Sequence, residues 1–186
     1  MAYPVYYPAG CAAEIGDHYC NDCEDFESGR VSLVAFISSD FAFNDPTNRN
    51  EWVAGIQAKQ IIIIPKTSGA FDGGSEVETP GYGRQATQLT GYNFVLTYND
   101  PNYKFNADFY NAIKRSSNYK LAFGTETLIH LTETTVSIVP KNPVVDDVTS
   151  RVVWVVSVKW ADDDLPVPYT MPAGLDLCFD YTGAIT

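Results

Sequence analysis

Basic residues, histidine and methionine are scarce in this sequence. Twelve Lys and Arg face 23 Asp and Glu, which gives a formal net charge of −11. Proteins bind nucleic acid and anionic membranes mainly through Lys and Arg, so this excess of acidic residues argues against both kinds of partner. Two histidines and two methionines leave little material for a metal site or a general base.

Long apolar runs are missing as well. No run approaches the roughly 18 apolar residues that a membrane-spanning helix needs. Residues 1–10 (MAYPVYYPAG) have neither a basic region nor an apolar core, so they do not read as a signal peptide. We therefore expect no membrane partner and folding in the cytoplasm in which the chain is made.

Aromatic residues are abundant instead. The 186 residues include 12 Tyr, 10 Phe and 3 Trp, and 45% of the chain is hydrophobic. This length is long enough to bury a core and is most simply one domain. A composition rich in aromatic residues and poor in leucine favours strands over helices.

Several segments have the pattern of strands. Residues 30–38 (RVSLVAFIS) and 60–65 (QIIIIP) are apolar on both faces, which predicts cover on both sides, and we expect Pro65 to end the second strand. Residues 151–160 (RVVWVVSVKW) place Val152, Trp154, Val156, Val158 and Trp160 on one face. Further strands are predicted at residues 89–98, 119–123, 128–131 and 136–139. The predicted fold is mainly β, an antiparallel β-sandwich or barrel.

One short α-helix is predicted between two of these strands, across an open end of the sandwich. Residues 106–116 (NADFYNAIKRS) place Phe109, Ala112 and Ile113 on one face, which we expect to turn towards the sheet. Lys114 and Arg115 should then face water. Residues 46–55 (PTNRNEWVAG) can hold a single helical turn around Trp52.

Three segments lack lasting periodicity. We predict an extended N-terminal arm at 1–28, a β-sandwich domain at 29–160 with a long inter-strand loop at 66–84, and an extended C-terminal arm at 161–186. The loop (KTSGAFDGGSEVETPGYGR) has no G-x-G-x-x-G before a helix and no G-K-[ST], so it does not predict a nucleotide site. A flexible, hairpin-like excursion is the favoured interpretation. Such segments bury little apolar surface alone, so we expect them to be mobile in a subunit and ordered in an assembly.

Four cysteines are present, and three of them crowd the N-terminal arm. A Cys-x-x-C pair plus two further thiolates could form a tetrahedral zinc site, with His18 as a spare ligand. The acidic surroundings disfavour thiolates, so reduced cysteines are the favoured interpretation, and a disulfide would require an oxidising compartment. The cysteines are Cys11, Cys20, Cys23 and Cys178.

No arrangement of catalytic residues emerges. His130 lies in a predicted strand and belongs to no nucleophile motif. The carboxylates at 146–147 and 162–164 could bind calcium, but they lack the spacing of a calcium loop and are better explained as solvated loop residues. We therefore predict a protein that is not an enzyme, with no catalytic, cofactor-binding or metal-binding residues.

Residues 92–101 (YNFVLTYNDP), the helix and residues 116–125 (SSNYKLAFGT) together resemble tail-tube-type proteins of tailed bacteriophages. In those proteins a strand, a short Asp-rich turn and a helix lead to a further strand. Residues 136–147 and 152–159 are similar to their last two strands. The cysteine-rich arm before residues 30–38, followed by 61–74 (IIIIPKTSGAFDGG), is similar to virion proteins of the crAss-like phages.

This resemblance implies a structural virion protein that forms a homo-oligomeric ring in the tail or neck. DNA would pass through the ring without specific binding during genome ejection, and the neighbours would be other tail, neck or portal-region proteins. The alternative is a binding module on the virion surface, such as a head fibre or decoration protein with a β-sandwich fold.

Overall fold

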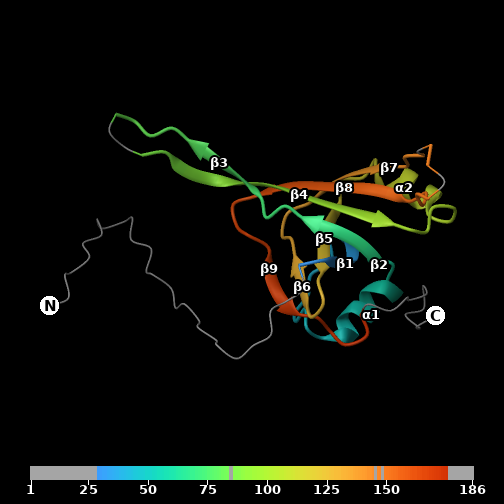
Figure 1. The fold of residues 1–186 in the computed structure, drawn as a ribbon. Helices are drawn as coiled ribbons and strands as arrows, with labels where there is room; N and C mark the ends of the chain where they lie inside the picture. Colours follow the sequence, from blue (N-terminus) through green and yellow to red (C-terminus); the bar gives the residue numbers. More distant parts are fainter. Residues whose placement is uncertain (1–28, 84–85, 145, 148, 176–186) are drawn as a thin grey trace, which may run out of the picture.

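The structure, a computed structural model, describes residues 29–83, 86–144, 146–147 and 149–175, and this part contains nine strands and two helices. The strands are all antiparallel and form one sheet in the order β7-β8-β4-β2-β1-β5-β6-β9, with β3 beside β4 (Figure 1). This arrangement confirms the predicted mainly-β fold. The strands are β1 (Val31–Ser38), β2 (Ile61–Phe71), β3 (Ser75–Thr79), β4 (Gln88–Asp100), β5 (Tyr119–Gly124), β6 (Leu128–Leu131), β7 (Ser137–Lys141), β8 (Trp154–Asp162) and β9 (Val167–Thr170), and the helices are α1 (Arg49–Gln57) and α2 (Ala107–Ile113).

The sheet curls until its β7 edge returns to β5. Just before β7, the backbone N–H of Val136 donates to the carbonyl of Tyr119 over 2.8 Å. The Thr132 hydroxyl accepts from the Leu121 N–H at 2.9 Å, which continues the pairing beyond β6. The Val136–Tyr119 bond brings together β7 and β5, which lie far apart in the sheet order, so six strands enclose a barrel-like interior. This interior holds the larger core cluster, with side chains from β1, β2, β4, β5, β7, β8 and α2.

Strand β1 runs through the middle of the molecule and is buried on both faces, as its sequence predicted. Val34 and Phe36 point into the barrel interior. The alternate residues form a second cluster on the outside of the sheet. Because both faces are apolar, β1 requires this second layer. The outer cluster contains Leu33, Ala35, Ile37, Trp52, Ile56 and Leu175.

Helix α1 (Arg49–Gln57) provides much of this outer layer. The Asn48 side chain accepts from the Asn50 N–H at 3.0 Å and caps its start. Trp52 and Ile56, four residues apart, share its buried face. The prediction of one helix was therefore wrong, because the predicted single turn is a complete helix whose length depends on packing against the sheet.

Helix α2 (Ala107–Ile113) closes one end of the barrel near the predicted position. Tyr110 and Ile113 are buried, and half-buried Phe109 approaches Phe36 with ring centroids 6.4 Å apart. Ala112 is exposed, so it was wrongly assigned to the inner face, and Tyr110 takes the place expected for it. Lys114 and Arg115 are exposed, as predicted.

The predicted loop at 66–84 is mostly strand. Strand β2 (Ile61–Phe71) continues through Pro65, which lies opposite Leu33 of β1. Pairing with β4 begins only at Ser68, so at Pro65 the strand has a partner on one side only and tolerates the missing N–H. Strand β3 (Ser75–Thr79) then pairs with β4 (Gln88–Asp100). The Gly-rich and acidic composition of this segment indicated a loop, but pairing with the long strand β4 outweighs the weak strand preference of these residues. The prediction that the four isoleucines at 61–64 are buried on both faces of the strand was also wrong, since Ile62 is 39% exposed.

The boundary at residue 161 was placed too early. Strand β8 (Trp154–Asp162) begins three residues later than predicted, with Val152 41% exposed, and ends two residues later, and β9 (Val167–Thr170) pairs with β6. Leu175 is fully buried in the outer cluster. Residues 161–175 therefore belong to the folded body, because β6 and α1 offer them an edge and an apolar face. The predicted arm at 1–28 and residues 176–186 lie outside the described residues.

Candidate functional site

A hairpin formed by β3 and the first part of β4 projects beyond the folded body (Figure 1). All five residues of β3 are exposed, and Tyr82 near the tip is 88% exposed. Leu89 on the returning strand is 50% exposed. The hairpin thus offers backbone edges and scattered apolar side chains while contributing little to the core.

A tight junction joins the hairpin to the body. One carboxylate oxygen of Asp72 accepts from the N–H groups of Gly74 and Val95, each at 3.0 Å. Gly74 has a φ of +89°, and a Cβ at this position would lie 2.4 Å from the ring of Phe94. Only glycine fits this conformation and this approach without strain. The junction therefore fixes the direction in which the hairpin leaves the barrel.

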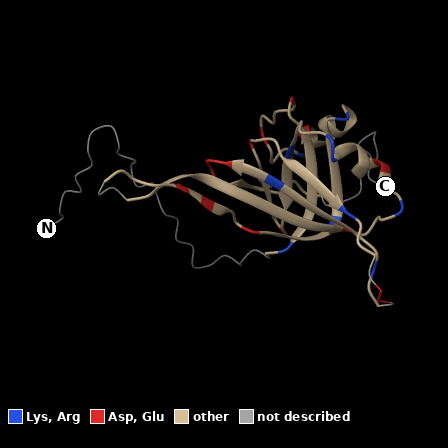
Figure 2. Cartoon of the chain, turned by 90° about the horizontal axis from the view of Figure 1, so that it is seen from above, with Lys and Arg blue, Asp and Glu red and all other residues tan. Residues whose placement is uncertain are grey.

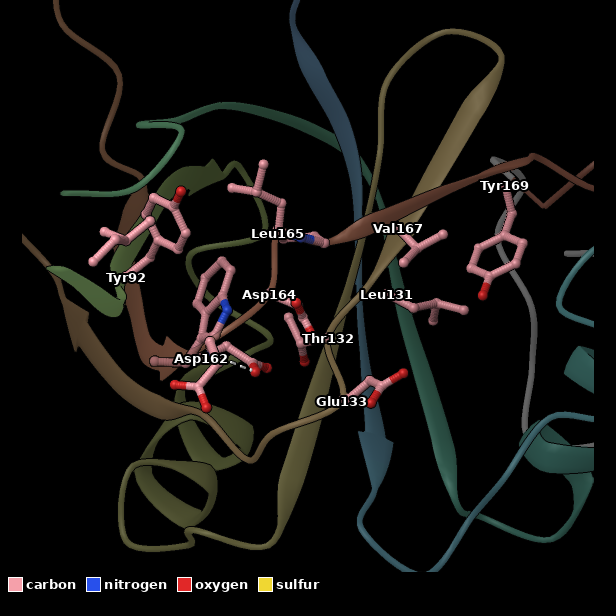
Figure 3. A pocket seen from close by; sticks show the side chains of 13 residues that line it. Tyr92, Leu131, Thr132, Glu133, Asp162, Asp164, Leu165, Val167 and Tyr169 are labelled. Atoms are coloured by element: carbon pink, nitrogen blue, oxygen red, sulfur yellow. Dashed lines mark hydrogen bonds between the residues drawn. The ribbon is translucent and has the colours of Figure 1, made fainter. Parts of the chain in front are cut away.

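A cleft of about 480 Å³ lies at the base of the hairpin. Side chains of β4 and β8 border it on one side, and β6, β9 and the β6–β7 and β8–β9 connections contribute the rest. Figure 3 shows Leu165 of the β8–β9 connection and Val167 of β9 lying across from Thr132 and Glu133. The other labelled lining residues are Tyr92, Leu131, Asp162, Asp164 and Tyr169.

Aromatic rings form one side of this cleft and extend from it into the barrel. Trp160 stacks on Phe94 with centroids 5.2 Å apart and on Phe71 at 5.8 Å. Tyr92, half-buried at the cleft, stacks on Phe94 at 5.7 Å. The apolar side of the cleft is therefore continuous with the main core and is held rigidly by it.

All the charged residues that line the cleft are acidic. Glu133, Asp162, Asp163 and Asp164 all line it, and none of the described lining residues is Lys or Arg. Asp162 is engaged locally, accepting from the Thr134 hydroxyl at 3.1 Å, whereas Asp163 and Asp164 are exposed. Like charges gathered in a concave surface favour a cationic partner.

At the opposite end of β4, a buried carboxylate organises residues 101–106. Asp100 is fully buried and accepts from the Asn102 N–H at 2.9 Å, the Asn106 amide at 2.6 Å and the Tyr110 hydroxyl at 2.8 Å. These bonds satisfy a carboxylate that would otherwise be costly to bury. The side chain of Phe105 projects from this ordered segment and is 81% exposed.

Burial strongly affects the two tyrosines of this network. The Tyr98 and Tyr110 hydroxyls lie 3.3 Å apart, and Asp100 is close to both. Removal from water raises the pKa of each phenol far above its ordinary value of 10.0. Both rings therefore remain neutral at physiological pH and act as hydrogen-bonding parts of the core.

The residues considered from sequence lie apart from one another. His130 lies on β6 with its ring stacked on Phe123 at 4.8 Å. Asp147 accepts from Ser150 and Thr149, and these hydrogen bonds hold its pKa below the ordinary 3.8. Only the carboxylates at 162–164 contribute to the cleft. Cys11, His18, Cys20, Cys23 and Cys178 lie outside the described residues.

Two further observations concern the described residues. No group of three or more His, Cys, Asp or Glu among them is placed to hold a metal ion. None of the helices in this part of the chain is both long and apolar enough to cross a membrane.

Comparison of the chain with protein-family models, with curated proteins and with solved structures gave no match. The function of this chain is therefore inferred from its residues and their geometry. Sequence reasoning missed the cleft, whose lining comes from segments far apart in the chain. The available signal was the three consecutive aspartates after an alternating strand, which were interpreted as solvated loop residues.

Proposed function

We propose that this protein is a structural subunit of a tailed-bacteriophage virion and forms a homo-oligomeric ring in the tail or neck around the DNA channel. Its neighbours in the virion would be other tail, neck or portal-region proteins. The proposal begins from the resemblance of residues 92–125 to tail-tube-type proteins. That segment folds as the strand β4, a turn, the helix α2 and the strand β5, which is the order that the resemblance implies.

The projecting hairpin is the observation that carries the proposal. A two-stranded ribbon outside a core is only marginally stable by itself, and its unpaired edge is a ready site for another chain. Among the described strands, β3, β7 and β9 each pair with one neighbouring strand only. A subunit that contacts copies of itself would bury these surfaces in the assembly.

The charge of the chain supports passage of DNA without retention. The formal net charge is −11, and Figure 2 shows Asp and Glu but no Lys or Arg on the described part of the hairpin. Neutralising phosphates with Lys and Arg is the main source of non-specific DNA affinity. An acidic wall would repel the phosphates at short range and let DNA slide.

Size and shape at increasing protein concentration test the proposal. We expect analytical ultracentrifugation to show a discrete oligomer and negative-stain images to show rings with an open centre. The assembled protein should show no salt-dependent binding to double-stranded DNA. A chain that stays monomeric at every concentration, or that binds DNA tightly, would contradict this function.

The cleft favours a second candidate, a binding module on the virion surface. Aromatic rings beside carboxylates can hold a sugar, with stacking on one side and hydrogen bonds on the other. Tyr92, Trp160 and Tyr169 provide the rings. In this case added glycans would quench tryptophan fluorescence of a monomer or small oligomer, and no ring would form.

A further inference from the structure

The exposed Phe105 has the properties of an interface anchor. It lies in a segment held by two hydrogen bonds to Asp100, from the Asn102 N–H and the Asn106 amide, and a third comes from Tyr110 of the following helix α2. Tyr103 in the same segment stacks on Trp154 at 5.4 Å, and its carbonyl accepts from the indole N–H at 3.0 Å. A rigidly presented aromatic side chain loses little conformational entropy on binding, which is typical of residues that dominate interfaces.

The surroundings of Phe105 are mainly basic. The Lys104 ammonium lies 5.8 Å from the centre of the Phe105 ring, and exposed Lys114 and Arg115 follow α2 at the same end of the barrel. Exposed Asp108 is the acidic residue in the first turn of that helix. An apolar ring flanked by cations complements a cleft that has an aromatic side and four carboxylates.

The two surfaces lie at opposite ends of the same pair of strands. Pairing of β4 with β8 begins at Tyr92 and Asp162, which line the cleft, and ends at Asp100 and Trp154, which support the segment at 101–106. At the rise of an antiparallel strand this pairing spans about 27 Å. Figure 1 shows the two ends well separated, with the hairpin beyond one and α2 at the other. One chain therefore cannot bring the two surfaces together without a second copy.

We propose that a second copy of this chain inserts its Lys104–Phe105 segment into the cleft at the base of the hairpin. The Phe105 ring contacts the apolar side formed by Tyr92 and Leu165, and Lys104 pairs with Asp163 and Asp164. The contact is head-to-tail, so each copy has one donor and one acceptor surface, and repetition generates a closed ring or an open filament. This inference names the contact within the proposed ring and rests on that function.

Complementation between two variants of the full chain tests the contact. Phe105→Ser removes the donor surface and keeps the cleft, whereas Leu165→Ser weakens the cleft and keeps the donor. Both side chains are exposed, so both variants should fold with an unchanged circular dichroism spectrum. We expect each variant to self-associate roughly tenfold or more weakly than the wild-type chain. Mixed in equal amounts, they should form a dimer of twice the chain mass of 20.5 kDa and nothing larger.

Charge exchange provides an independent test. Lys104→Glu should weaken assembly, and combining it with Asp163→Lys and Asp164→Lys should restore assembly at least in part. Lys66→Glu is the matched control, because Lys66 is an exposed lysine on β2 in the body. This substitution changes the net charge by the same amount as Lys104→Glu. It should assemble like the wild-type chain. Failure of the triple exchange to restore assembly would contradict the assigned charge pairing.

The results separate this contact from the proposed function. Rings formed equally well by wild type and Phe105→Ser would overturn the contact and leave the ring function standing. A wild-type chain that remains monomeric at all concentrations would overturn both. Filaments that require Phe105 would support the contact and contradict the ring.

Discussion

The two halves of strand β4 occupy contrasting environments. From Phe94 to Asp100, alternate side chains are buried in the barrel core, whereas residues 88–90 lie exposed in the hairpin. Gly91 and Tyr92 mark the change between them. The same continuous strand therefore serves stability at one end and is available for contacts at the other. This difference explains why the body should fold without partners while the hairpin gains stabilising contacts only from another chain.

Replacing leucine by alanine in the two halves of β4 should give the largest difference in the free energy of unfolding. Leu96 is completely buried, so Leu96→Ala should lower the free energy of unfolding by about 2–5 kcal/mol through lost burial and a residual cavity. Leu89→Ala, on the same strand in the hairpin, should change it by less than about 0.5 kcal/mol. Urea denaturation of the two variants measures the difference. Equal losses would show that the hairpin belongs to the cooperative unit.

Removing the buried carboxylate of Asp100 should have the next largest effect on the free energy of unfolding. Asp100→Ala leaves the Tyr110 hydroxyl and the Asn106 amide without their acceptor, which should cost about 2–3 kcal/mol. Glu76→Ala on the exposed hairpin is the control and should be close to neutral. Chemical denaturation followed by tryptophan fluorescence compares them. A neutral Asp100→Ala would mean that water replaces the carboxylate at little cost.

Glycine substitutions sharpen the boundary between the two regions. Gly74→Ala at the junction meets both a positive φ and the Phe94 ring, so a loss of about 2 kcal/mol is expected. Gly83→Ala near the tip also has a positive φ, of +67°, but meets no atom within 4 Å, so about 1 kcal/mol of backbone strain is expected. Thermal unfolding ranks the two variants, and the reverse order would place the rigid junction elsewhere.

The alkaline stability of the body provides a smaller test. The pKa of Tyr98 and that of Tyr110 lie above the ordinary 10.0 in the folded protein. Their contribution to the free energy of unfolding is therefore complete below pH 10 and declines as the pH rises further. Tyr98→Phe should reduce this decline without removing it. Ultraviolet titration of tyrosinate, with unfolding measured at each pH, checks both statements.

The sequence predicted those elements whose own residues determine them. Two-faced burial of β1, the alternation of β8 and the bounds of β6 follow from apolar spacing alone, and the structure agrees. Strands β3 and β9 were missed because Gly, Pro and acidic residues disfavour strands locally. Pairing with β4 and β6 outweighs that preference.

The candidate site was less predictable than the fold. The aromatic side of the cleft depends on the stacking of Trp160, Phe94 and Phe71, which come from three different strands. Its carboxylates come from two separate parts of the chain, the β6–β7 connection at Glu133 and the end of β8 with the residues after it at 162–164. No spacing along the chain reveals that these groups meet, because curling of the sheet brings them together.

One measurement tests the central claim that the body folds alone and the hairpin serves assembly. Residues 80–87 are replaced by an Asn-Gly turn, which suits a two-residue hairpin. Wild-type and shortened chains are then compared by urea denaturation and by negative-stain imaging at high concentration. The account predicts unfolding free energies equal within about 0.5 kcal/mol. It also predicts weaker ring assembly by the shortened chain, which keeps the Lys104–Phe105 segment and the cleft but loses the contacts of the hairpin tip. Rings formed equally by both chains, or a shortened chain that unfolds much more easily, would contradict it.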